Sequence, residues 1–169
     1  MKKLPFKKYV LFSSIILIGI ILDQLTKWLT VKFIPMYAKR TLINKLIGLT
    51  YITNDGAAWG MLDNHRWVFM LTSTVAILAM GAYLYLGFSQ NKLYDISLAV
   101  IISGGIGNMI DRVALGEVVD MIELLFIDFP VFNVADSLVC VGAGLLILAL
   151  VLDIIKESKK GNKDASDSN

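Results

Sequence analysis

Residues 134–152 read VADSLVCVGAGLLILALVL, a run of apolar and small residues in which Asp136 is the single charged side chain. One helix needs about 20 such residues to cross the hydrocarbon core of a bilayer. An aspartate inside a membrane helix costs roughly 2.5 to 3.5 kcal/mol on insertion scales, so it tends to be paired or functional. This segment therefore predicts a membrane protein and marks Asp136 as a candidate functional residue.

Three more apolar segments precede this one, and together the four predict an all-α membrane protein, a bundle of four transmembrane helices. The composition agrees, because 56% of the residues are hydrophobic, 18% are charged and the mean hydropathy is +0.68, which is far more apolar than a soluble domain. We expect one membrane-embedded domain over residues 1–155, with spans at about 9–30, 66–88, 94–112 and 133–153. Residues 156–169 form a polar tail that we expect to be disordered.

The charge distribution bears on orientation. Four lysines precede the first span and four more follow the fourth span, so the positive-inside rule places both termini of this multi-pass chain in the cytoplasm and the tail with them. The first loop also carries basic residues, which weighs against that orientation: Lys32, Lys39, Arg40, Lys45 and Arg66.

The two longer connections differ in character. Residues 46–53 form a short apolar and β-branched run, and the turn signal Asn54-Asp55-Gly56 follows it, so a small extracytoplasmic β-sheet is expected between the first and second helices. Residues 113–132 are unusually apolar for a connection. We expect them to form a segment in the membrane interface between the third and fourth helices.

Several classes of chemistry lack the residues that they need. The only histidine is His65, which excludes a His-Glu-x-x-His zinc site and argues against a nucleophile paired with histidine. No Gly-x-x-x-x-Gly-Lys phosphate loop occurs, and a net charge of +2 without a basic stripe gives no support for nucleic-acid binding. No metal site is therefore expected, and the remaining candidates are carboxylates, amides and basic residues near the span ends.

Two interpretations of Asp136 stay open. It stands three residues after Asn133, so it could serve only to cap the fourth helix. Alternatively, the apolar connection folds back and brings Asp120 against the mouth of that helix. Two carboxylates about 3 Å apart repel by roughly 5 kcal/mol at an effective dielectric of about 20, so such a pair would keep one proton near neutral pH. That is the arrangement of aspartic proteases, and it predicts peptide hydrolysis.

Other polar residues lie at helical spacing. Asn108, Asp111 and Arg112 share one face of the third helix, and Asp23 and Lys27 share one face of the first. Each group is compatible with a structural ion pair or with support of the same polar pocket. The chief rival function is a transporter or channel subunit, but its polar residues should run through the membrane depth. A purely structural scaffold is the third interpretation.

Three motifs are familiar in this order: NMIDR at 108–112, GEVVD at 116–120 and FPVFNVADS at 129–137. With Asp23, Lys27, Asn54 and Gly56, they resemble lipoprotein signal peptidase (signal peptidase II) over nearly the whole chain. One mild departure is Trp59, where that family commonly has phenylalanine.

The resemblance implies an aspartic endopeptidase of the bacterial cytoplasmic membrane, without a cofactor. It would cleave signal peptides from prolipoproteins, on the N-terminal side of a cysteine that carries a diacylglyceryl group, and its site would face the outer leaflet. Membrane lipid and globomycin-like inhibitors are implied partners, nucleic acid is not, and a monomer is expected. By the same resemblance Asp120 and Asp136 are the catalytic pair, and the residues that line or support the site are Asp23, Lys27, Asn54, Gly56, Asn108, Arg112, Asn133 and Ala135.

Overall fold

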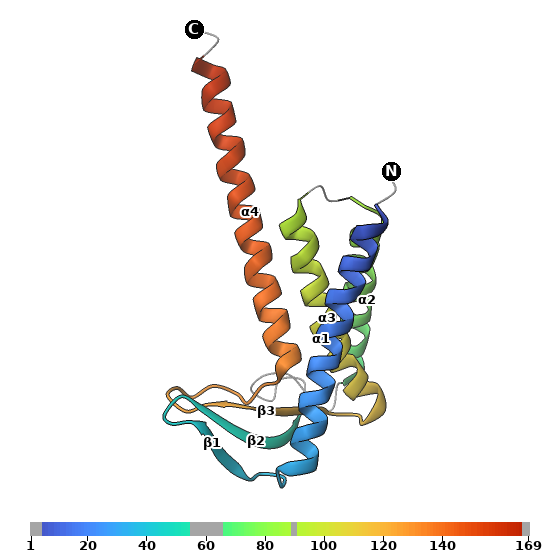
Figure 1. Ribbon diagram of the computed structural model, residues 1–169, viewed down its shortest axis with the longest axis vertical. Coiled ribbons are helices and arrows are strands. Elements are labelled where there is room, and N and C mark those ends of the chain that lie inside the picture. The colour runs from blue at the N-terminus through green and yellow to red at the C-terminus, as the bar shows by residue number, and fades with distance from the viewer. Residues whose placement is uncertain (1–4, 55–65, 89–90, 167–169) are drawn as a thin grey trace.

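The computed structural model describes residues 5–54, 66–88 and 91–166. Along these residues run four helices and three strands, and the helices form a bundle with the sheet across one end (Figure 1). In chain order they are α1 (Phe6–Phe33), β1 (Lys39–Ile43), β2 (Ile47–Asn54), α2 (Arg66–Tyr85), α3 (Lys92–Ala114), β3 (Val118–Leu124) and α4 (Val134–Ser166).

Among the described residues, three helices are long and apolar enough to cross a membrane: Phe6–Phe33, Lys92–Ala114 and Val134–Lys160. Met70–Tyr85, within α2, is a shorter apolar helix. Large apolar side chains of α1, such as Leu17, Ile18 and Ile21, are exposed, because in a bilayer the surrounding lipid is as apolar as a protein core. The fold is therefore that of a mostly helical membrane protein with a small sheet.

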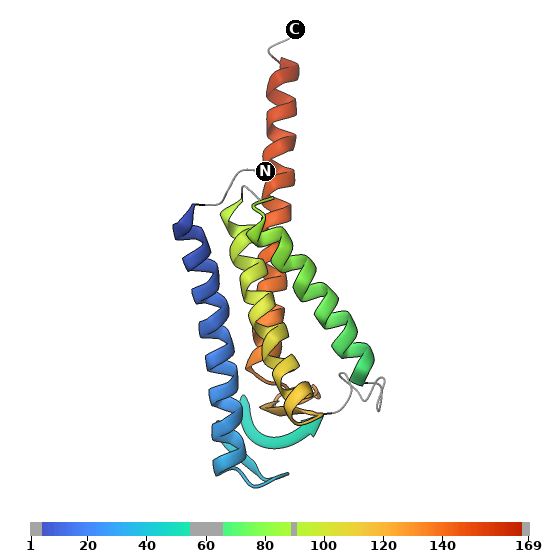
Figure 2. The ribbon, with the colours of Figure 1, turned by 90° about the vertical axis from the view of Figure 1, so that its right-hand side faces the viewer.

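Close helix packing depends on small residues. Figure 2 shows α1 and α2 on either side of the α3–α4 pair. A Cβ atom at Gly104 of α3 would collide with the backbone oxygen of Ala135, and one at Gly142 of α4 would collide with Ile101. These glycines let α3 and α4 approach backbone to backbone, which brings the start of α4 close to the polar end of α3.

The sheet differs from the expectation in one respect. Its order is β1-β2-β3 with antiparallel pairing throughout, so residues 118–124 of the third connection form a strand of the sheet. The sheet is thus not confined to the segment between the first two helices, and the connection between α3 and α4 is more than an interfacial segment. Pairing with β2 satisfies backbone groups that would otherwise be unpaired at a membrane surface. In this register Asp120 lies opposite Ile52, and Val118 lies opposite Asn54.

The fourth helix also departs from the expectation. It continues beyond Asp153 to Ser166, so residues 156–166 are helical where the sequence predicted disorder. Glutamate and lysine are good helix formers, and they extend a helix that is already nucleated. The extra turns project beyond the other helices, at the end of the bundle opposite the sheet (Figure 1).

Candidate active site

Asp120 is placed by the sheet. It lies on β3, its side chain is buried, and the side chain amides of two residues hold it. Nδ2 of Asn133 donates to its Oδ1 atom at 2.6 Å, and Nδ2 of Asn54, at the end of β2, donates to its Oδ2 atom at 3.1 Å. Both carboxyl oxygens of Asp120 are thus fixed in position by neutral donors.

Asp136 is placed by the first turn of α4. Oδ1 of Asn133 accepts a hydrogen bond from the Asp136 backbone N–H at 2.9 Å, and Oδ2 of Asp136 accepts one from the Asn133 N–H at 3.2 Å. This reciprocal pair is a capping box, so the capping interpretation is correct. It is also incomplete, because Oδ1 of Asp136 accepts from Nδ2 of Asn108 at 2.7 Å and the side chain lines a cavity.

Two asparagines connect the acid pair, which is our name for Asp120 and Asp136. Asn133 donates to Asp120 and caps the helix that carries Asp136, while Asn108 of α3 donates to Asp136. The amides also bond to each other, because Nδ2 of Asn133 donates to Oδ1 of Asn108 at 3.1 Å. One continuous amide chain therefore spans both carboxylates.

Behind this chain lies a buried ion cluster. The Lys27 ammonium is 2.9 Å from Oδ2 of Asp23 and 3.0 Å from Oδ2 of Asp111, and it donates to Oδ1 of Asn108 at 2.9 Å. All three charged side chains are buried. A buried charge of this kind is tolerated only with such partners. The ammonium group thus orients the Asn108 amide so that its N–H₂ group faces Asp136.

The same cluster holds the backbone on both sides of the acid pair. Oδ1 of Asp23 accepts from the Ala135 N–H at 2.9 Å, and Oδ2 of Asp111 accepts from the Val119 N–H at 3.1 Å. Val119 precedes Asp120 in the chain and Ala135 precedes Asp136. Each supporting carboxylate therefore fixes the main chain one residue before a member of the acid pair.

The surroundings of Asp120 shift its proton affinity. Burial is the main cause that raises its pKa from the usual 3.8 to about 6, and the negative charge of Asp136 adds to the effect. The hydrogen bonds from Asn54 and Asn133, and the positive charge of Lys27, act in the opposite direction. Since desolvation dominates, Asp120 gains and loses a proton close to neutral pH.

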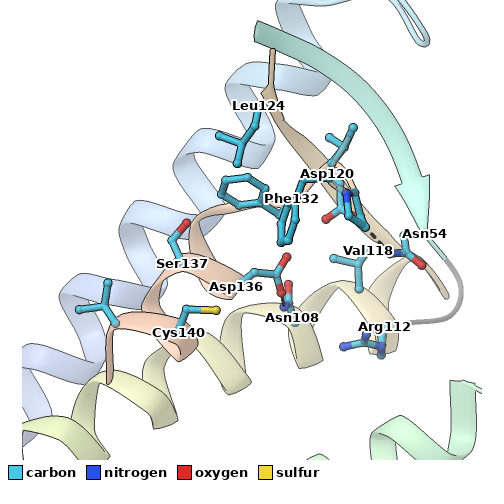
Figure 3. A pocket seen from close by; sticks show the side chains of 14 residues that line it. Asn54, Asn108, Arg112, Val118, Asp120, Leu124, Phe132, Asp136, Ser137 and Cys140 are labelled. Carbon is cyan, nitrogen blue, oxygen red and sulfur yellow. Dashed lines mark hydrogen bonds between the residues drawn. The ribbon is translucent and has the colours of Figure 1, made fainter. Parts of the chain in front are cut away.

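The acid pair faces a cavity of about 600 Å³. In Figure 3 the side chains of Asp120, from β3, and Asp136, from α4, lie on neighbouring sides of it, with Phe132 beside them. The remaining wall is largely apolar. Such a cavity suits an extended apolar peptide whose polar backbone must meet two carboxyl groups. The lining residues are Asn54, Asn108, Arg112, Val118, Asp120, Leu124, Phe129, Pro130, Val131, Phe132, Asp136, Ser137, Cys140 and Val141.

The structure brings together the site residues that the sequence indicated, as far as it describes them. Asn54, Asn108 and Arg112 line the cavity with the acid pair. Asp23, Lys27, Asn133 and Ala135 lie behind it and act through the hydrogen bonds given above. Gly56 lies outside the described residues.

Sequence reasoning missed Gln24. Its Nε2 atom donates to Oδ1 of Asp111 at 2.9 Å, to the carbonyl oxygen of Gly107 at 3.1 Å and to Oδ2 of Asp23 at 3.2 Å. It thus ties α1 to α3 within the ion cluster. Its position beside Asp23 was a signal, but the partners on α3 become visible only in the fold.

Comparisons with known sequences identify one family along most of the chain. The family described as signal peptidase (SPase) II matches residues 15–152. A lipoprotein signal peptidase of Latilactobacillus sakei is 40% identical over 144 residues, which are 85% of this chain and 93% of that protein. A lipoprotein signal peptidase of Bacillus subtilis is 37% identical over 153 residues, 89% of this chain and 99% of that protein.

Comparison with solved structures leads to the same fold. One structure, described as a bacterial membrane enzyme solved by the in meso method at 2.3 Å resolution, has a TM-score of 0.82 and 31% identity, and the match covers 91% of this chain and 94% of that one. A second such structure, at 1.9 Å resolution, has a TM-score of 0.78, again with 31% identity, and covers 89% and 97%. The architecture of helices and sheet is therefore shared along nearly the whole chain.

Proposed function

This chain belongs to the signal peptidase II family, a family of membrane peptidases, and from that premise we propose that it cleaves the signal peptide from prolipoproteins with Asp120 and Asp136 as its catalytic pair. The relatives named above are lipoprotein signal peptidases, which supplies the substrate class. The observation that carries the proposal is the position of two hydrogen-bonded carboxylates, one buried and one half-buried, on one largely apolar cavity.

In the acid pair, one carboxyl group is ionised and acts as the base, and the other is protonated and acts as the proton donor. Asp136 sits in the first turn of α4 and accepts a backbone N–H there, which favours its anionic form. The pKa of Asp120 is raised to about 6 by burial, which favours its protonated form. We therefore assign the base to Asp136 and the shared proton to Asp120, with the titration belonging to the coupled pair.

In the reaction, a water oxygen bonds to the carbonyl carbon of the scissile peptide while Asp136 takes one proton of that water. The Asp120 carboxyl group donates its proton toward the carbonyl oxygen and so stabilises the tetrahedral intermediate. The C–N bond then breaks, and the leaving amine takes the proton held by Asp136. Return of the carbonyl-oxygen proton to Asp120 restores the starting state.

The substrate would reach the site within the membrane. A cysteine that carries a diacylglyceryl group holds the scissile bond at one depth and reduces the search to two dimensions. The sheet and the acid pair lie at the same end of the bundle (Figures 1 and 3), and we place this end at the outer leaflet of a bacterial cytoplasmic membrane. Cleavage occurs N-terminal to the lipidated cysteine.

The remaining topology follows from that placement. We assign α2, which follows α1 and precedes α3 in the chain, as the fourth membrane span, since it runs from the sheet end of the bundle toward the opposite end (Figure 2). Both termini then lie in the cytoplasm. A transport path is not favoured, because the described acids of the site gather at the sheet end rather than along the membrane depth.

Cyclic peptides of the globomycin type should compete for the same cavity, because it offers apolar walls and two carboxyl groups. We propose that the monomer is sufficient, since one chain supplies every residue of the cavity. Competition would be seen as an apparent inhibition constant that rises with substrate concentration. Cleavage by protein incorporated at one copy per nanodisc would test the monomer.

The decisive experiment measures cleavage of a purified diacylglyceryl-modified prolipoprotein. Asp120→Asn and Asp136→Asn should each lower kcat by at least about 10³-fold, while thermal unfolding in detergent shows that both variants still fold. Asp111→Asn is the control in the supporting cluster and should retain partial activity. Normal cleavage by either variant of the pair would show that the assignment is wrong.

A further inference from the structure

A second cavity lies beside the sheet, apart from the acid pair. Its volume is about 570 Å³, and it shares no lining residue with the active-site cavity. The strand β3 separates the two, because Asp120 and Val118 line one cavity and Met121 lines the other. The mechanism proposed above makes no use of this space.

Its walls are apolar. They come from the last turns of α1 and from all three strands, chiefly from Leu29, Phe33, Leu42, Ile47 and Leu49. Phe33 and Leu42 remain exposed on the outside of the protein, so the cavity opens toward the surroundings of the bundle. A space of this size and lining accommodates part of an acyl chain.

One charged side chain, Arg40 of β1, lines this cavity, and no acidic residue does. Within the described part of the chain its guanidinium group makes no hydrogen bond or ion pair. Its neighbour Lys39 differs, because successive side chains of a strand face opposite sides and Lys39 pairs with Glu123. Arg40 thus offers a planar group of several donors beside an apolar space, which suits a phosphate group.

The surroundings place this cavity at the level of a membrane interface. The Lys32 ammonium lies 4.5 Å from the centroid of the Trp28 ring on the last turns of α1, and tryptophan and long basic side chains gather at that level. The β1–β2 hairpin also exposes Leu42, Ile43 and Leu46. A lipid of the bilayer can therefore place its acyl chains against the apolar side chains of the hairpin while its headgroup lies at the depth of the basic side chains.

We propose that this cavity binds one anionic phospholipid of the bilayer, with an acyl chain against the apolar wall and the phosphate group on Arg40. The absence of an acid among the lining residues leaves nothing to hold the ammonium of a choline headgroup, so a phosphatidylglycerol type is favoured. The bound lipid ties β1 and β2 to the membrane surface. Through the pairing of β2 with β3 it steadies the strand that carries Asp120.

The test uses the full-length protein purified in a neutral detergent, with binding of phosphatidylglycerol or phosphatidylcholine measured by native mass spectrometry. Arg40→Gln should lower the affinity for phosphatidylglycerol by about tenfold, which a lost bidentate phosphate contact explains. Lys45→Gln is the matched control, because it removes the same charge from the same hairpin without lining the cavity. It should change affinity by less than about twofold.

Equal losses in the two variants would indicate only diffuse attraction to the basic hairpin and would overturn the proposal. So would equal binding of both lipids by the wild type. Displacement of phosphatidylglycerol by a neutral diacylglyceryl peptide would assign the cavity to the substrate lipid instead. A dimer whose formation excludes lipid would assign it to a second copy of the chain.

Discussion

The two ends of α1 each hold a lysine against a buried aspartate of α3 at the same distance. Lys8 lies 3.0 Å from Asp95, and Lys27 lies 3.0 Å from Asp111. Their surroundings differ, because the Lys8 side chain is 33% exposed and the Lys27 side chain only 4% exposed. Lys27 is also shared with Asp23 and Asn108. The same lysine–aspartate contact therefore only joins α1 to α3 at one end of α1, whereas at the other end it belongs to the ion cluster that supports the acid pair.

Removal of the Lys27 ammonium group should have the largest effect on stability. Lys27→Met leaves Asp23 and Asp111 buried without their cation, so the free energy of unfolding should fall by about 3 to 5 kcal/mol. Chemical unfolding in detergent, followed by tryptophan fluorescence, measures this loss. A loss no larger than that of Lys8→Met would mean that burial does not distinguish the two ends.

The next largest effect is on how the free energy of unfolding depends on pH. The folded pKa of Asp120 is raised from 3.8 to about 6, so the folded protein binds more protons than the unfolded chain between these values. Wild-type stability then falls as pH rises through this window, by up to about 3 kcal/mol. Asp120→Asn removes the titration, and its stability relative to wild type should increase from pH 4 to pH 8.

The control for this pH profile is Ser13→Ala, which leaves Asp120, all its partners and every charged group in place, because among the described residues the Ser13 hydroxyl bonds only to Tyr85. Its unfolding free energy should run parallel to that of the wild type across the same pH range. A difference between wild type and Asp120→Asn that stays constant with pH would contradict the raised pKa.

Loss of the amide between the ion cluster and the acid pair should affect turnover. Asn108→Ala removes the hydrogen bond to Asp136 and the link to Lys27. A hydrogen bond to a charged group is worth about 1.5 to 3 kcal/mol, so kcat should fall roughly 10- to 100-fold with KM little changed. Steady-state cleavage of the lipidated substrate measures the two constants separately.

Ser13→Ala is the matched polar-to-alanine control, because the Ser13 hydroxyl bonds to Tyr85 at the opposite end of α1. Its kcat should equal that of the wild type. An Asn108→Ala variant that raises KM alone would assign Asn108 to substrate binding rather than to positioning of Asp136.

The smallest effect on stability is expected for the ion pair between Lys8 and Asp95, at the end of α1 away from the acid pair. Lys8→Met removes a partly exposed ion pair, and Asp95 keeps a favourable place in the first turn of α3. The cost should be about 1 kcal/mol, with unchanged kcat. Thermal unfolding and the cleavage assay, made on the same preparation, report the two values. A large loss of activity would show that the two ends are coupled along α1.

The sequence predicted the membrane fold because hydrophobic runs report directly on the surrounding solvent. It also singled out Asp136, since one acid within an apolar run is costly. The strand at 118–124 was missed, because an apolar connection is equally compatible with an interfacial segment and its partner strand ends more than sixty positions earlier, at Asn54. The helical extension to Ser166 was missed because a polar composition does not separate a solvated helix from a disordered tail.

The sequence by itself determined that this is a membrane protein, which residue types are available for chemistry and, by family resemblance, which residues are expected at the site. Only the tertiary structure decided which aspartates line the cavity and which form the ion cluster behind it. Asp120 and Asp136 face a cavity, whereas Asp23 and Asp111 share Lys27 behind it. The reason is physical: the i,i+4 spacing on α1 already indicates that Asp23 meets Lys27, but the contact of Lys27 with Asp111 joins α1 to α3 and the pairing of β2 with β3 places Asp120. No local pattern of residues encodes contacts across such long stretches of chain.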